Sequence, residues 1–237
     1  PRHCAVTATT TLTPDLRGKA TLAGVLYAVI IVAGIWGEAA VRAPLLYPDD
    51  PQRTATTVQA ALGLVRASLA TDVLMLIADV GLAVLLYRLL RAQGPTLAMA
   101  AMAFRLMQAA VLAANLLNLQ VMVLLLDGAR SATLLGDSAA AWSTLLLQAH
   151  AHGYDLGLVF FGVNAVLTGA LLWRAAWVPR ALALLVIAAG VVYLMGSCVR
   201  LLAPGLSDAL APAYALPLLA ESAFCGWLLW AGAGSKR

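Results

Sequence analysis

Six long apolar segments alternate with short polar stretches along the chain, at residues 20–41, 67–90, 96–126, 139–173, 181–202 and 212–231. A helix needs about 20 apolar residues to cross a bilayer, so each segment is long enough to span one. The third and fourth exceed that length and predict helices that tilt or protrude. We therefore predict an all-α fold, a polytopic bundle of six transmembrane helices that forms one domain from residue 19 to residue 237.

Two polar stretches precede or separate these segments. Residues 42–66 contain Pro44, Pro48 and Pro51, which predicts a loop with a short surface helix near residues 54–64. Residues 1–18 are rich in threonine and lack the apolar core of a signal peptide. We expect them to form a short flexible tail on the cytoplasmic side.

Ionisable or amide side chains interrupt the apolar segments at Glu38, Asp72, Asp79, Arg105, Asn115, His150, Asp155 and Glu221. A charge near the centre of a bilayer costs about 2.5–3.5 kcal/mol on insertion scales, so such residues face the inside of a bundle and mark functional sites. Their number predicts a polar site built inside the membrane.

The composition agrees with a membrane location. The chain is 62% hydrophobic and 11% charged, and its mean hydropathy is +0.90, whereas soluble domains contain about 25% charged residues. The net charge of +4 does not predict nucleic-acid binding, because the basic residues are scattered at the ends of the segments rather than gathered in a stripe. The lipid bilayer is the expected partner.

The positions of lysine and arginine predict the orientation, because these residues concentrate on the cytoplasmic side of membrane proteins. With six spans, nine of them fall on one side: Arg2, Arg17, Lys19, Arg88, Arg91, Arg174, Arg180, Lys236 and Arg237. The basic residues on the other side are balanced by aspartates. We expect both termini in the cytoplasm.

Helical geometry gathers the polar residues on one face of each segment. Asp72 and Asp79 lie seven residues apart, as do Gln108 and Asn115, which places each pair on one helix face. Asp79 and Arg105 lie at similar depths on neighbouring segments, counted at 1.5 Å of rise per residue. Because a buried arginine requires an anionic partner, this predicts a structural ion pair between Asp79 and Arg105.

The remaining polar residues predict a second group, in the outer half of the bundle. Glu38 lies four residues before Arg42 and can pair with it. Counted in residues from the ends of their segments, four other residues lie at similar depths in this half, namely Asp72, Asn115, His150 and Glu221. This group contains too few cationic side chains to pair with its carboxyl groups. Desolvation favours the neutral, protonated form of a carboxyl group, which can donate a proton.

The fourth segment contains His150, His152 and Asp155 within six residues, which raises the hypothesis of a metal site. Residues two apart on a helix point about 200° apart, so the two histidines share a metal only if the helix breaks at Gly153. We predict that no metal is bound, and a site of His150, His152 and Asp155 is the weaker alternative.

We expect no cofactor. A bis-histidine haem needs ligands on facing helices, whereas the histidines of the apolar segments all lie in the fourth. A retinal Schiff base is excluded because the two lysines, Lys19 and Lys236, lie at the membrane edges. Glycine loops that bind nucleotides and aspartate-rich motifs that bind a diphosphate through magnesium are absent.

Several short motifs lie after residue 18, namely Ala23-Gly-Val-Leu-Tyr27, Gly34-Ile-Trp-Gly-Glu38, Arg105-Leu-Met-Gln108, Asn115-Leu-Leu-Asn118, His150-Ala-His-Gly-Tyr154 and Gly157-Leu-Val-Phe-Phe-Gly162. Together they resemble a bacterial family of six-helix membrane proteins that is known as a domain of unknown function. The resemblance implies the six-helix fold and the inner membrane of a bacterium, and it implies no reaction. It marks Glu38, Asp72, Asp79, Arg105, Asn115, His150 and Glu221 as family positions.

These residues fit an intramembrane enzyme that acts on a lipophilic small molecule, for example an isoprenoid. The candidate acid–base residues are Asp72, Glu221, His150 and Glu38. The candidate substrate-binding residues are Asn115, Gln108, Tyr154, Tyr27 and Phe161. Small membrane-embedded terpene cyclases are similar in size, helix number and buried carboxyl groups, which is a likeness of architecture rather than of motif.

Two other functions stay open. A proton-coupled transporter could use the same carboxyl groups as a relay, although the two halves of the chain show no internal repeat of the kind many carriers have. A noncatalytic subunit or ligand-binding protein could use the polar groups only to fix the helix register. The sequence leaves the substrate and the oligomeric state open.

Overall fold

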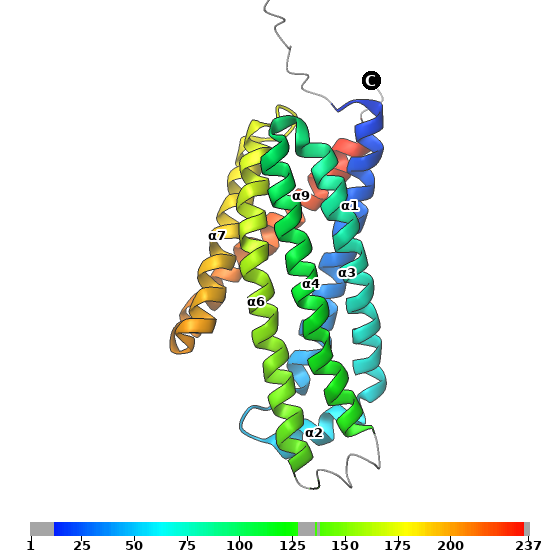
Figure 1. Ribbon diagram of the computed structural model, residues 1–237, viewed down its shortest axis with the longest axis vertical. Helices are drawn as coiled ribbons and strands as arrows, with labels where there is room; N and C mark the ends of the chain where they lie inside the picture. The colour runs from blue at the N-terminus through cyan, green and yellow to red at the C-terminus, as the bar shows by residue number, and fades with distance from the viewer. Residues whose placement is uncertain (1–11, 128–135, 137, 235–237) are drawn as a thin grey trace, which may run out of the picture.

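The computed structural model of the protein describes residues 12–127, 136 and 138–234, and the secondary structure within these ranges is helical (Figure 1). Six of the described helical stretches are long and apolar enough to cross a membrane: Pro14–Leu45, Leu62–Gln93, Pro95–Leu126, Ser138–Arg174, Arg180–Leu202 and Ala211–Ala233. This confirms the predicted all-α bundle of six spans. The chain is a multi-pass membrane protein.

The first spanning stretch changes its helical geometry along its length. Helix α1 (Pro14–Ile35) continues into a π-helical turn, η1 (Trp36–Arg42), and a short 3₁₀ turn, η2 (Ala43–Leu45). Helix α1 begins within the expected tail, of which residues 1–11 lie outside the described residues. The predicted loop that follows contains the surface helix α2 (Pro51–Ala60).

The other spans follow the predicted segments closely, as α3 (Leu62–Leu90), α4 (Pro95–Leu126), α6 (Ser138–Arg174), α7 (Arg180–Leu202) and α9 (Ala215–Ala233). Short helical turns connect them, namely η3 (Arg91–Gln93), η4 (Pro204–Leu206), α8 (Ser207–Leu210) and η5 (Ala211–Tyr214). The last span begins at η5, which contains Pro212, close to the predicted start, and its α-helical part begins at Ala215.

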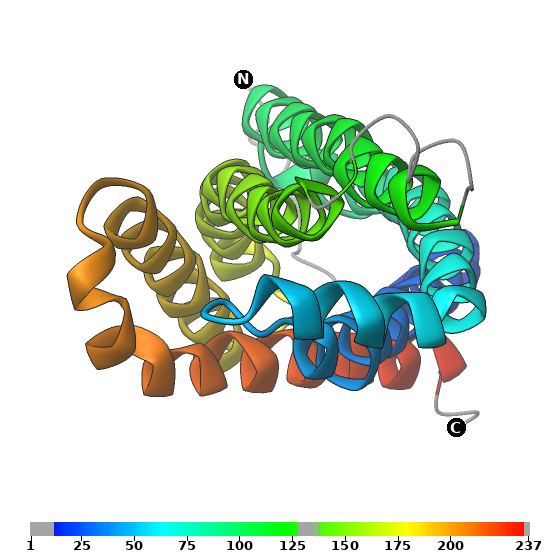
Figure 2. The same ribbon diagram turned by 90° about the horizontal axis from the view of Figure 1, so that it is seen from below.

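The spanning helices form a ring in which each contacts the next along the chain, and α9 closes the ring against α1 (Figure 2). Both described ends of the chain lie at the same end of the bundle, which we name the termini end (Figure 1). Helix α2 lies at the opposite end, the α2 end. Helix α9 crosses behind the bundle at a slant rather than parallel to α4 and α6 (Figure 1).

The contact between α6 and α7 is close because glycines face one another. A Cβ atom on Gly162 would lie 2.9 Å from the carbonyl oxygen of Gly190, and one on Gly190 would lie 2.8 Å from that of Gly162. Small residues let helix backbones approach in this way, and the resulting van der Waals packing holds helices together in lipid.

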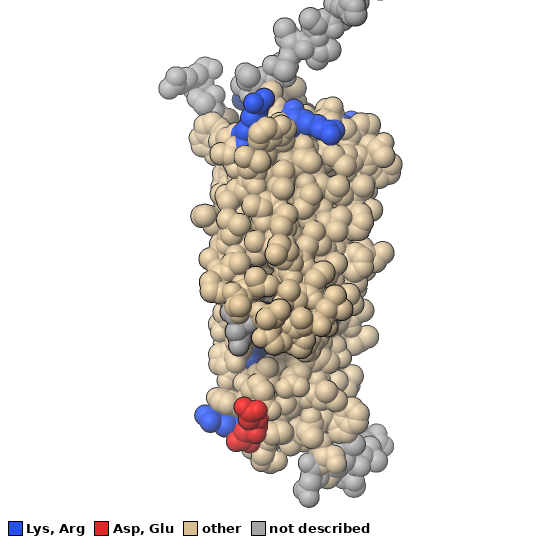
Figure 3. All heavy atoms as spheres, turned by 90° about the vertical axis from the view of Figure 1, so that its left-hand side faces the viewer, with Lys and Arg blue, Asp and Glu red and all other residues tan. Residues whose placement is uncertain are grey.

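The outside of the bundle suits a lipid environment. Five large aliphatic residues on three of the spanning helices are each more than 60% exposed, namely Val32, Leu74, Ile77, Leu117 and Leu124. In the side view, lysine and arginine gather at the termini end, and most of the wall between the two ends is uncharged (Figure 3). The polar residues of the spans therefore lie mainly inside the ring.

Candidate functional site

Asp79 on α3 and Arg105 on α4 form a buried ion pair inside the ring. Arg105 Nε lies 2.8 Å and Nη2 lies 2.5 Å from the same carboxylate oxygen, Oδ1 of Asp79, and both residues are 3% exposed. This is the ion pair that the depths along the two segments predict. The guanidinium carbon also lies 5.4 Å from the ring centre of Tyr27 and 5.1 Å from that of Phe161, within the range of a cation–π contact.

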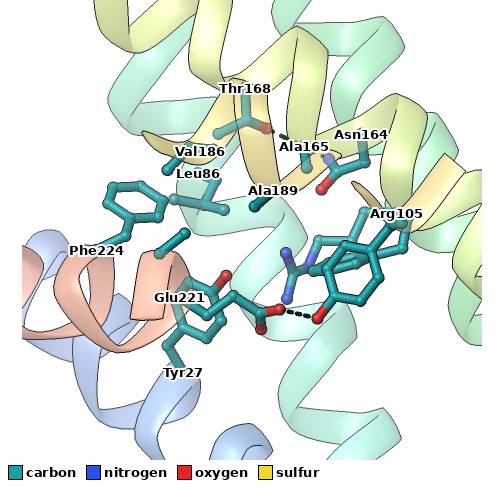
Figure 4. A pocket seen from close by; sticks show the side chains of 13 residues that line it. Tyr27, Leu86, Arg105, Asn164, Ala165, Thr168, Val186, Ala189, Glu221 and Phe224 are labelled. Atoms are coloured by element: carbon teal, nitrogen blue, oxygen red, sulfur yellow. Dashed lines mark hydrogen bonds between the residues drawn. The ribbon is translucent and has the colours of Figure 1, made fainter. Parts of the chain in front are cut away.

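Glu221 on α9 accepts a hydrogen bond from the hydroxyl group of Tyr193 on α7. In the close-up, Glu221 and Arg105 point toward one another from opposite sides of the ring (Figure 4). The sequence reasoning placed Glu221 with Asp72, and that placement is wrong. Because α9 crosses the bundle at a slant, counting residues along an upright helix misjudged its depth.

Tyr193 is a site residue that the sequence reasoning missed. Its ring packs edge-on against Phe161, with ring centres 5.3 Å apart, and against Tyr214, at 6.1 Å. The available signal was that Tyr193, Ser197 and Arg200 share one face of their helix, because they lie four and seven residues apart. That pattern does not identify Glu221 as the partner of Tyr193.

These groups surround a cavity of about 60 Å³, which we name the central cavity. Its polar lining consists of Asp79, Arg105, Gln108, Tyr154, Tyr193 and Glu221. A water molecule needs at least about 10–15 Å³ of such space, so a few water molecules or one small chemical group can fit. Within the described part of the chain, Asp79 Oδ2 and Gln108 Oε1 are buried without a hydrogen-bond partner, so two acceptor atoms are free.

A second space of about 20 Å³ adjoins the central cavity, and we name it the apolar cavity (Figure 4). Arg105, Glu221, Phe161 and Tyr193 line both spaces. The rest of its lining is mostly apolar and includes Tyr27, Leu86, Ala165, Val186, Ala189 and Phe224. The two spaces therefore combine a polar compartment with an apolar extension.

A second ionic group lies nearer the α2 end, and we name its three residues, Glu38, Arg42 and Asp72, the Arg42 cluster. Arg42 Nη1 lies 2.7 Å from Asp72 Oδ2, and Arg42 Nε lies 2.9 Å from Glu38 Oε2. Arg42 and Asp72 are buried, whereas Glu38 is 58% exposed. Asp72 therefore has a cationic partner that the sequence did not assign to it, and the predicted contact between Glu38 and Arg42 is present.

Gly37 makes room for this cluster. A Cβ atom at this position would lie 3.1 Å from both terminal guanidinium nitrogens of Arg42 and 3.2 Å from Asp72 Oδ1. Gly37 lies within the π-helical turn η1, and such turns occur often at functional sites. The turn and the glycine together allow a guanidinium group to reach the inside of the ring.

His150 on α6 is held by Asn115 on α4. Asn115 Nδ2 donates to the backbone carbonyl of His150 at 2.8 Å and lies 3.2 Å from His150 Nδ1. Asn118 Nδ2 in turn donates to Asn115 Oδ1 at 2.9 Å. The two residues come together as predicted, but Asn115 positions the imidazole and does not line the cavities described above.

The metal alternative gains no support from the arrangement of its residues. His152 is exposed and His150 is buried, and Asp155 Oδ2 faces Arg200 Nη1 on α7 at 3.2 Å. Within the described residues, no group of three or more histidine, cysteine, aspartate or glutamate side chains could hold a metal ion. Arg200 is the partner of Asp155 that the sequence reasoning did not assign.

Residues 22–232 match the family model of DUF4386, a domain of unknown function, and the chain therefore belongs to that family. Comparison with curated proteins and with solved structures found no match.

Proposed function

We propose that this DUF4386 protein is an intramembrane enzyme that moves a proton on a lipophilic small molecule in the central cavity. One observation carries the proposal, namely that Glu221, bound by Tyr193, and the Asp79–Arg105 ion pair line the same cavity. Two carboxyl groups with different partners in one cavity are the arrangement by which acid–base enzymes separate a proton donor from a proton acceptor.

In this proposal Glu221 is the proton donor and Asp79 is the proton acceptor. Glu221 transfers its proton to one atom of the substrate, and Asp79 Oδ2, which has no partner among the described residues, removes a proton from another atom. The net change is an isomerisation or a proton-initiated cyclisation, which needs no oxidant, reductant or second substrate. Tyr193 orients the Glu221 carboxyl group for the transfer.

The shape of the site supports a lipophilic substrate. The central cavity has room for the reacting group, and the apolar cavity extends from it between α3, α6, α7 and α9. A short hydrocarbon part of the substrate can pack there against Val186, Ala189 and Phe224, where burial of apolar surface contributes about 25 cal/mol per Å². An isoprenoid is one class with this combination of an apolar body and a protonatable double bond.

The packing at the termini end supports a site that is closed toward that side. Leu86, Leu89, Leu171, Leu172 and Leu228 belong to one buried apolar cluster there. A carrier must expose its site to both sides in turn, and these leucines would have to separate to open the termini end. The arrangement therefore favours an enzyme over a transporter.

We also propose that the termini end faces the cytoplasm of a bacterial cell and that the bundle lies in the inner membrane. Basic residues gather at this end, as the side view shows (Figure 3). They include Arg17, Lys19, Arg88, Arg91, Arg174 and Arg180. Cytoplasmic loops of membrane proteins carry such an excess of lysine and arginine.

Deuterium incorporation tests the proposed reaction. The protein is purified with its native lipids, returned to bilayers in D₂O, and the lipophilic molecules that remain bound are analysed by mass spectrometry. We expect one class to gain deuterium in the wild type and not in Glu221→Gln. Asp127→Asn, which changes an exposed carboxylate paired with Arg66, is the matched control and should behave as the wild type. Incorporation that persists in Glu221→Gln would overturn the proposal.

A further inference from the structure

A third cavity lies between the Arg42 cluster and the central cavity, and we name it the relay cavity. It measures about 10 Å³, which is close to the space of one water molecule. Its polar lining consists of Arg42, Asp72, His150 and Tyr154. Nothing in the proposed reaction uses these four residues.

Two buried atoms of this lining have no hydrogen-bond partner within the described residues, namely Asp72 Oδ1 and His150 Nε2. Asp72 is 2% exposed and His150 is 3% exposed. A buried polar atom without a partner is costly, and one water molecule can satisfy two such atoms at once. The cavity therefore fits a water molecule that bridges the carboxylate and the imidazole.

The imidazole is fixed in the orientation that such a bridge requires. His150 Nδ1 lies 3.4 Å from the backbone carbonyl oxygen of Asn115, to which it donates the ring hydrogen, and Asn115 Nδ2 donates to the backbone carbonyl of His150. This leaves Nε2 as the free nitrogen. Asn118 in turn holds the amide oxygen of Asn115, so the contact has support from a second residue.

The relay cavity is continuous in its lining with the central cavity. Met75, Leu76, Leu112 and Tyr154 line both. Tyr154 follows His150 by four residues on α6, which places the two side chains next to one another on one helix face. The Tyr154 hydroxyl group is thus the polar group that separates His150 from the cavity containing Glu221.

We propose that these residues form a proton relay from the α2 end to Glu221. The proton enters from solvent at Glu38, whose carboxylate is 58% exposed, and passes through water to Asp72. The bridging water donates a proton to His150 Nε2, the resulting imidazolium gives that proton to the Tyr154 hydroxyl oxygen, and Tyr154 releases its own hydroxyl hydrogen into the central cavity. Each group that gives up a proton receives another from the group before it, so every group returns to its starting state.

The net charge of the Arg42 cluster allows this cluster to take up a proton. Arg42 carries one positive charge and contacts two carboxylates, so the cluster has one negative charge that a proton can neutralise. Arginine keeps its own proton in proteins, and its role is to hold the two carboxylates in place. The relay rests on the proposed function, because it reprotonates Glu221 after each turnover; Asp79 releases to solvent the proton that it accepted, so the isomerisation consumes no net proton.

Infrared spectroscopy of the protein in bilayers tests the relay without a substrate. The band of a protonated carboxyl group that disappears in Glu221→Gln is assigned to Glu221, and its exchange is followed after transfer from H₂O to D₂O. We expect His150→Ala to slow this exchange about a hundredfold, the lower range of what one positioned proton donor contributes. Added imidazole should restore part of the rate, which it would not do for a merely structural residue.

Two further variants complete the experiment. His152→Ala changes an exposed histidine two residues away on the same helix and should exchange as the wild type does. His150→Gln keeps an amide beside Asn115, carries no proton onward and should be as slow as His150→Ala, so it serves if the alanine variant fails to fold.

The outcomes separate the two proposals. If the Glu221 band is present and its exchange does not depend on His150, the relay is wrong and the acid role of Glu221 stands. If no band disappears in Glu221→Gln, Glu221 carries no proton, and both the proposed function and the relay are overturned.

Discussion

Arg42 and Asp72 meet inside the ring because the first spanning helix changes geometry just before its end. The two residues lie 30 positions apart, and their side chains are 2.7 Å apart at Nη1 and Oδ2. The π-helical turn η1 ends at Arg42, and its hydrogen bonds to the fifth residue widen the helix there. Arg42 is 5% exposed, whereas Glu38, in the same turn, is 58% exposed. The turn thus directs the cation inward and leaves one carboxylate near the surface.

Gly37→Ala should destabilise the Arg42 cluster. The added methyl group would lie 3.1 Å from the guanidinium and 3.2 Å from Asp72 Oδ1, so one of them must move. We expect the free energy of unfolding, measured by SDS titration in bicelles, to fall by about 1–3 kcal/mol, as for other overpacked sites.

Gly226→Ala is the matched control for this change. Gly226 is exposed in α9, and no atom lies within 4 Å of the Cβ position. Because alanine favours a helix over glycine by about 1 kcal/mol, this variant should be as stable as the wild type or more stable. Equal effects of the two substitutions would show that the cluster has no tight packing at Gly37.

Arg105→Met should be strongly destabilising because it leaves Asp79 buried without its cation. Loss of one partner from a buried ion pair costs about 3–5 kcal/mol. Thermal unfolding in detergent should show a marked fall in Tm, and the double variant Asp79→Leu with Arg105→Met should recover most of it. Arg66→Met, which breaks an exposed pair with Asp127, should cost at most about 1 kcal/mol. A double variant as unstable as Arg105→Met alone would contradict this account.

Gly153 and Asn115 should be energetically coupled. A Cβ atom on Gly153 would lie 2.1 Å from Asn115 Oδ1, a distance that cannot be accommodated without displacing the amide that holds His150. Gly153→Ala should therefore destabilise the protein far more in the wild type than in Asn115→Ala. In a double-mutant cycle, contacting residues show a coupling energy of about 0.5–3 kcal/mol. A coupling energy near zero would mean that α4 and α6 adjust freely at this point.

The sequence predicted those features that depend on periodicity and helix length. The six spans follow from apolar length alone, and the Asp79–Arg105 pair follows from depth because α3 and α4 are neighbours joined by a short turn. The predictions were wrong where a helix is irregular or tilted. The π-helical turn brings Arg42 to Asp72, and the slant of α9 carries Glu221 to Tyr193 (Figure 1).

Those two departures decide the composition of the site. If all helices were regular and upright, Asp72 and Glu221 would form one group, and Asp79 would lie outside it as a structural residue. With the two departures, Glu221 joins Asp79 at the central cavity, and Asp72 moves to the relay cavity with His150. A residue pattern cannot give the tilt of a helix, because tilt is set by packing against neighbouring helices.

Tyr193→Phe should reduce the proposed reaction while leaving the fold intact. The substitution removes only the hydroxyl group that binds Glu221, and the ring can keep its edge-on contact with Phe161. We expect the rate of deuterium incorporation into the bound lipophilic molecule to fall about a hundredfold, because the donor carboxyl group loses its orientation. The control is Tyr214→Phe, whose hydroxyl group faces Ser197 and whose ring packs against Tyr193. Both variants should unfold at similar temperatures, and an equal fall in rate for both would show that the aromatic cluster, rather than the bond to Glu221, controls the reaction.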